Sequence, residues 1–119
     1  MSTRSRIAVE QEDGTVLSVY CHNDGYVSGV GSELLNMFPN GTDVTDVINY
    51  IKKGDRTTVG MSYKEWRDED CPNDTVGSLT DFFEGDIEEY GYLYTFKKEW
   101  LVKASYASQA PPNRLEELV

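Results

Sequence analysis

The sequence predicts one domain of the α+β class, with an antiparallel sheet of about five strands and two or three helices packed on one face. Hairpin patterns stand near both ends of the chain, and two helical patterns lie between them. The order of hairpin, two helices, strand, acidic segment, hairpin and short helix is typical of α+β domains. A chain of 119 residues suits a single domain over residues 1–119 with one small core.

The N-terminal hairpin is expected over residues 6–21. Ile7 and Val9 share one face of its first arm at the two-residue period of a strand. Gly14 follows Asp13 and can take the positive φ of a tight turn. The second arm carries apolar groups on both faces, which predicts a strand inside the sheet. Its two faces are Leu17, Val19 and Cys21 against Val16, Ser18 and Tyr20.

Two amphipathic helices are expected next, because apolar residues recur at the spacing that lines one helix face. The first has Ser28 or Ser32 as candidate N-cap and ends at Pro39-Asn40-Gly41. The second has Thr42 or Asp43 as candidate N-cap. The apolar stripes are Val30, Leu34, Leu35 and Phe38 in the first helix, and Val44, Val47, Ile48 and Ile51 in the second.

The second half of the chain is expected to contain one further hairpin among shorter elements. These are, in order, a strand over 57–63, a loop over 67–75, a short helix over 76–84, a hairpin with arms 90–96 and 100–106, and a short C-terminal helix over 113–119. Aromatic residues alternate on one face of the first hairpin arm, and Lys97-Lys98-Glu99 forms the turn. Pro111-Pro112 ends the second arm.

The composition describes an acidic protein, with 21 Asp and Glu against 11 Lys and Arg, a net charge of −10 and a pI near 4.4. Such a charge repels nucleic acid backbones and anionic membranes, so we expect no direct nucleic acid binding and no membrane association. No apolar run approaches the ~20 residues of a membrane span, and the start of the chain does not resemble a signal peptide. Cys21 and Cys71 are expected to be free thiols in a reducing cytoplasm.

Nearly all of the charge falls between residues 65 and 89, where ten acids and one base give a balance of −9. We name residues 65–90 the acidic segment. Aromatic residues interleave with its acids, a mixture typical of a protein-binding face, since aromatics anchor and carboxylates steer a basic partner. The residues expected to bind the partner are Trp66, Asp68, Glu69, Asp70, Glu84, Asp86, Glu88 and Glu89. The alternatives are a solvated acidic loop whose aromatic residues lie in the core, and a mimic of DNA phosphates.

The run YCHNDGY, residues 20–26, brings reactive groups close together in sequence. As a hydrolase site it would use Cys21 as nucleophile, His22 as base and Asp24 to orient the imidazole. Neighbours on a strand point to opposite faces, so this interpretation requires the strand to end before them. We expect no metal site and no cofactor, because a closed zinc site needs four ligands and the chain has no CxxC spacing.

Two other interpretations of this run remain open. In the first, Cys21 faces the core, His22 and Asp24 hydrogen-bond the backbone, and Gly25 makes the turn into the next helix. In the second, a ligand pocket is formed by Tyr20, His22, Asp24 and Tyr26.

Four short motifs in the first third of the chain point to a family. They are TRS at residues 3–5, DGTV at 13–16, YCHNDGY at 20–26 and GVG at 29–31. Residues 3–35 resemble the start of a family of small proteins encoded by phages and prophages, with a TRS…DGTV…YCHxDGY…GVG pattern. The aromatic hairpin YLYTFKKEWLV, residues 92–102, is similar to the end of that family's members. Asn23 stands where the family more often has a bulky aromatic residue.

The resemblance implies a viral accessory protein in the host bacterial cytoplasm. With the charge pattern, it leads us to expect a small phage protein that binds and modulates or inhibits a host protein with a basic surface, without catalysis. Transcription, nuclease and defence proteins present such surfaces. The alternatives are a DNA mimic and a small hydrolase or ligand-binding protein with its site at residues 20–26.

Overall fold

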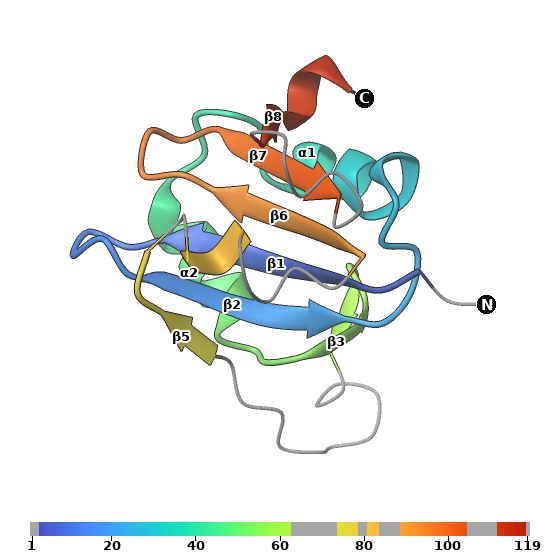
Figure 1. Ribbon diagram of the computed structural model, residues 1–119, viewed down its shortest axis with the longest axis horizontal. Helices are drawn as coiled ribbons and strands as arrows, with labels where there is room; N and C mark the ends of the chain where they lie inside the picture. The colour runs from blue at the N-terminus through green and yellow to red at the C-terminus, as the bar shows by residue number, and fades with distance from the viewer. Residues whose placement is uncertain (1–2, 63–73, 79–80, 84–88, 105–111, 119) are drawn as a thin grey trace.

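The two hairpins join edge to edge through their first strands, so the sheet is mixed (Figure 1). The computed structural model describes residues 3–62, 74–78, 81–83, 89–104 and 112–118. β1 and β2 form the first hairpin, β6 and β7 form the second, and β1 runs parallel to β6. The strands are β1 Ser5–Glu10, β2 Val16–Cys21, β3 Arg56–Thr58, β4 Met61–Ser62, β5 Asp74–Val76, β6 Tyr90–Tyr94, β7 Trp100–Ala104 and β8 Asn113–Arg114.

The expected fold class is confirmed as α+β, but the expected antiparallel sheet of about five strands is wrong. The described residues form eight strands, and β1 pairs parallel with β6 and β2 parallel with β3. The order across the sheet is β4-β3-β2-β1-β6-β7-β8, and β5 also pairs with β2. Side-chain alternation shows which face of a strand is buried, but not which strand lies at its edge. The parallel contact between β1 and β6 joins segments 85 residues apart, which no local pattern records.

The expected strand over 57–63 is replaced by two short antiparallel strands, β3 and β4. Residues 67–73 of the expected loop and residues 79, 80 and 84 of the expected helix lie outside the described residues. Where the chain is described, residues 74–76 form β5, which pairs antiparallel with β2, and residues 81–83 are helical. β2 therefore lies inside the sheet, as its two apolar faces predict.

Two helices connect the first hairpin to β3. A π-helical turn, η1 Val27–Gly31, leads into α1 Ser32–Met37, and α2 Val44–Ile51 follows. The side chain of Asp43 caps α2 by accepting a hydrogen bond from the backbone N–H of Thr45 at 3.0 Å, which confirms one of the expected caps. The expected serine caps of the first helix are wrong, since no side chain caps η1 or α1.

The sheet buries apolar side chains on both faces. The main core lies between the sheet and α1 and α2, and it includes Ile7, Val9, Val19, Tyr92, Tyr94, Trp100, Val30, Leu34, Val47 and Ile51. The opposite face carries a smaller cluster of Ala8, Val16, Leu93, Phe82 and Phe83. Figure 1 shows α2 behind the sheet and the 81–83 turn in front of it. The two main helices therefore share one face as expected, but the 81–83 turn covers the other.

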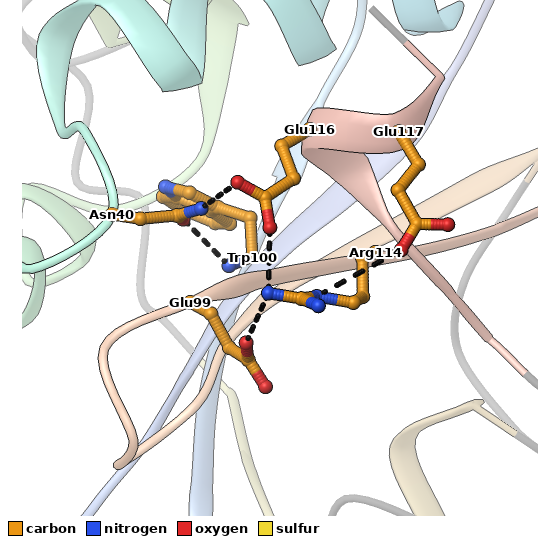
Figure 2. Close-up of polar contacts among 6 residues, drawn as sticks. All are labelled: Asn40, Glu99, Trp100, Arg114, Glu116 and Glu117. Carbon is orange, nitrogen blue, oxygen red and sulfur yellow. Dashed lines mark hydrogen bonds and ion pairs between the residues drawn. The ribbon is translucent and has the colours of Figure 1, made fainter.

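The C-terminal segment is a strap across the edge of β7, and of the short helix expected over 113–119 only a 3-10 turn at Leu115–Glu117 is helical among the described residues. β8 pairs with β7, and a 3-10 turn, η3 Leu115–Glu117, places the fully buried Leu115 in the main core. Arg114 forms ion pairs with Glu99 at 3.4 Å and with Glu116 at 2.6 Å (Figure 2). Asn40 Oδ1 accepts a hydrogen bond from the Trp100 N–H at 3.2 Å, and Asn40 Nδ2 donates one to Glu116 Oε2 at 2.9 Å. The loop after α1 therefore links the strap to the start of β7.

Among the described residues, no helix combines the length and the apolarity that a membrane-spanning helix needs.

Candidate functional site

The run YCHNDGY leaves the sheet at the end of β2 and turns at Asp24. Asp24 has a φ of 59°, in the left-handed region that Asn and Asp tolerate better than most residues. Gly25, expected to make the turn, does not have a positive φ. It is instead the point at which the run passes close to the N-terminal segment, where a Cβ on Gly25 would lie 2.8 Å from the carbonyl oxygen of Thr3.

Cys21 is buried in the main core. Its Sγ donates a hydrogen bond to the carbonyl oxygen of Asn23 at 3.7 Å. Burial raises the pKa of the thiol to about 11, which keeps it protonated at neutral pH. A protonated, core-facing thiol is a poor nucleophile, because the thiolate is the reactive form.

His22 makes its side-chain contact with Tyr20. The Tyr20 hydroxyl lies 2.6 Å from His22 Nδ1, and the two rings are tilted with centroids 5.8 Å apart. Both side chains are partly buried. The hydrolase interpretation would pair the imidazole with Cys21, whereas its Nδ1 contacts the hydroxyl of Tyr20.

Asp55 and Arg56 join this run from the start of β3, and the sequence pattern did not identify them. Asp55 Oδ1 accepts a hydrogen bond from the backbone N–H of Tyr20 at 2.9 Å, and the His22 N–H donates to the carbonyl oxygen of Arg56 at 3.0 Å. Arg56 is 2% exposed, and its guanidinium carbon lies 3.9 Å from the centre of the Tyr50 ring. A buried cation above an aromatic face is a stabilising contact. The sequence signal that could have pointed to these two residues is a charged pair directly after Gly54, at the end of the second helical pattern.

The other half of the run forms a pair at the surface. The Tyr26 hydroxyl donates to Asp24 Oδ1 at 3.3 Å, and Tyr26 is 43% exposed. The negative charge of Asp24 raises the pKa of the Tyr26 phenol. Of the four residues expected to form a ligand pocket, the structure pairs Tyr20 with His22 and Tyr26 with Asp24. The pocket itself stays a prediction.

Most of the expected partner-binding residues lie outside the described residues, namely Trp66, Asp68, Glu69, Asp70, Glu84, Asp86 and Glu88. Cys71 also lies outside them. Glu89 is described and partly buried. Its Oε2 accepts a hydrogen bond from the Arg4 N–H at 2.9 Å, and its own N–H donates to Arg4 O at 3.2 Å. Glu89 therefore holds the N-terminal segment beside the start of β6.

Two aromatic residues of the acidic segment lie in the core. Phe82 is fully buried and Phe83 is 6% exposed, and both pack on the sheet face opposite α2. They fix the acidic segment to the sheet and are not available to a partner.

In the part of the chain that the structure describes, no three His, Cys, Asp or Glu side chains gather into a group that could hold a metal ion. Comparisons of the chain with protein-family models, with curated proteins and with solved structures found no match.

Proposed function

We propose that the protein is a small phage accessory protein that binds a basic surface of a host protein and inhibits it, without catalysing a reaction. The observation that carries this proposal is the concentration of charge, because residues 65–89 hold −9 of a net charge of −10. A field of one sign, gathered on one part of a small domain, speeds encounter with a surface of the opposite sign.

The way the acidic segment is attached supports this role. β5 pairs with β2 inside the segment, Phe82 and Phe83 are buried on the sheet, and Glu89 is bonded to Arg4. These attachments place residues 74–76, Phe82, Phe83 and Glu89 of the acidic segment against the sheet and the N-terminal segment.

The chemistry of residues 20–26 favours binding over catalysis. Burial raises the pKa of Cys21, its Sγ bonds to the Asn23 carbonyl oxygen, and His22 Nδ1 contacts the Tyr20 hydroxyl, which argues against an activated Cys-His pair in this run. The run instead joins β2, β3 and the N-terminal segment.

Charge reversal within the acidic segment tests the proposal. The host partner is first isolated with the tagged protein at low salt, and its affinity for purified variants is then measured. We expect the triple variant Asp68→Lys, Glu69→Lys and Asp70→Lys to weaken binding by about tenfold or more, and to flatten its salt dependence.

A matched control reverses three exposed acids outside the segment, Glu12, Glu33 and Asp46. Both triples change the net charge equally. Equal losses of affinity would mean that only net charge matters, and an unchanged affinity of the first triple would refute the proposed site. Competition by duplex DNA for the same partner would show that the host surface is one that binds nucleic acid.

A further inference from the structure

The turn between β6 and β7 exposes an aromatic ring beside two lysines. Phe96 is 50% exposed, and Lys97 and Lys98 are both exposed. We name these three residues the hairpin tip. In a chain with a net charge of −10, they combine an apolar group and two positive charges at one point of the surface. Aromatic residues bordered by charge are the usual anchors of protein interfaces.

The hairpin tip is held by three neighbours. Within the turn, Lys98 N donates to Thr95 O at 2.9 Å. From the end of β1, Glu10 Oε1 accepts the Phe96 N–H at 2.9 Å. From the loop after α1, the Gly41 N–H donates to Lys98 O at 2.8 Å. A turn braced in this way keeps its side chains in place before any partner arrives.

Lys98 has a backbone conformation that lysine does not favour. Its φ is 68°, in the left-handed region where a side chain is strained. The neighbouring hairpin turn between β1 and β2 meets the same need with Gly14, whose φ is 88°. Glycine would adopt this conformation with less strain. The property that lysine supplies at this position is therefore its exposed, charged side chain.

We infer that the hairpin tip is a contact surface for a protein partner that has an apolar recess bordered by carboxylates. The Phe96 ring would enter the recess, and the ammonium groups of Lys97 and Lys98 would pair with the carboxylates. This contact lies outside the acidic segment, so it does not depend on the proposed function.

The surroundings favour a protein over an extended polyanion. Because β1 and β6 run parallel, the turns of both hairpins lie at the same end of the sheet (Figure 1). The β1–β2 turn carries Glu12 and Asp13. Hydrogen bonds with Thr45 lower the pKa of Asp43, and the positive charge of Lys98 lowers it further by a smaller amount. A nucleic acid or an anionic membrane large enough to cover the tip would also meet these carboxylates. A protein surface with a small acidic patch would not.

The test uses the full chain and a defined probe, a capped peptide of glutamates around one leucine. Binding is followed by amide NMR shifts at low salt. We expect saturable shifts centred on residues 95–99, and an affinity about tenfold lower for Phe96→Ser and for the double variant Lys97→Gln with Lys98→Gln. The chain supplies a matched control in its other lysine pair, since Lys52→Gln with Lys53→Gln removes the same charge elsewhere.

A second variant separates a binding role from a structural one. Lys98→Gly relieves the left-handed strain, so we expect its melting temperature to be equal to or above that of the wild type while its affinity for the peptide falls. Full retention of affinity in Lys98→Gly and in the double variant would overturn the inference. Equal losses in the Lys52 and Lys53 control would also overturn it. So would tighter binding of the tip to oligothymidylate or to phosphatidylglycerol vesicles than to the peptide.

Discussion

The hydroxyl of Tyr92 donates a buried hydrogen bond of 2.6 Å to the carbonyl oxygen of Gly25, a residue 67 positions earlier in the chain. Gly25 in turn donates its N–H to the carbonyl oxygen of Thr3 at 2.8 Å. One side chain of β6 thereby joins the turn after β2, and that turn holds the segment before β1. The N-terminal motif and the YCHNDGY run, which are separate in sequence, meet at this point.

Removing the Tyr92 hydroxyl should destabilise the fold. We expect Tyr92→Phe to lose about 1–3 kcal/mol in the free energy of unfolding, because the carbonyl of Gly25 would stay buried without its donor. Urea denaturation measures the loss. Tyr94→Phe is the control, since its hydroxyl bonds to Thr42 O at the same 2.6 Å but in a partly buried position. A larger loss in the control would contradict this account.

Gly25 should not tolerate even one additional carbon. A Cβ there would lie 2.8 Å from the Thr3 carbonyl oxygen and 2.9 Å from the Arg4 carbonyl carbon, and backbone atoms cannot move aside at low cost. We expect Gly25→Ala to lose about 1–3 kcal/mol of unfolding free energy. Gly60→Ala, where nothing lies within 4 Å of the new carbon, should change it by less than ~0.5 kcal/mol. Similar melting temperatures for the two variants would contradict the close approach.

The Tyr20–His22 contact can be measured by a double-mutant cycle. We expect Tyr20→Phe and His22→Ala to show a coupling of about 0.5–1.5 kcal/mol in the free energy of unfolding, as is usual for a short, partly buried hydrogen bond. The Tyr26–Asp24 pair, which is longer at 3.3 Å and exposed, should show a coupling close to zero in the same cycle. Equal couplings would mean that burial does not distinguish the two pairs.

The buried thiol of Cys21 should make the fold sensitive to alkali. Burial raises its pKa from 9.0 to about 11, so the folded state retains the proton over a range in which the unfolded chain releases it. The stabilisation is complete below pH 9 and is lost as the pH rises through 11. We expect about 2–3 kcal/mol of unfolding free energy to be lost across this window.

The variant Cys21→Ala provides the comparison for this prediction, measured in a Cys71→Ser background. Its free energy of unfolding should fall less between pH 8 and 11 than that of the parent, although its value at pH 8 is lower than the parent's. Burial also raises the pKa of Tyr92, so Tyr92 too lowers the free energy of unfolding at high pH. Both proteins contain Tyr92, so this contribution cancels in the comparison. Parallel pH profiles of the two proteins would show that Cys21 does not carry the effect.

Several elements were predictable because their signals are local. Alternation of Ile7 and Val9 predicted β1, and the glycine in the following turn does have a positive φ. Asp43 was predictable as a cap, since an acid just before an apolar helical stripe suits the unpaired N–H groups of a helix start. The core-facing position of Cys21 followed from its place in the period of β2.

The site could be predicted only in part. The run at residues 20–26 stood out by composition, but its contacts with Asp55, Arg56 and Tyr92 depend on chain segments 30 to 70 residues away. The same holds for Phe82 and Phe83, whose burial on the far face of the sheet depends on the path of the chain after β5.

The sequence by itself determined the two hairpins, the second helix with its cap, the α+β class and the concentration of negative charge, because each is a property of residues close together in the chain. Only the tertiary structure decided the parallel pairing of β1 with β6, the pairing of the C-terminal segment with β7, and the partners of Tyr20, His22 and Gly25. These features depend on which surfaces meet after folding. That choice is set by the packing of the whole core, which no local spacing of residues encodes.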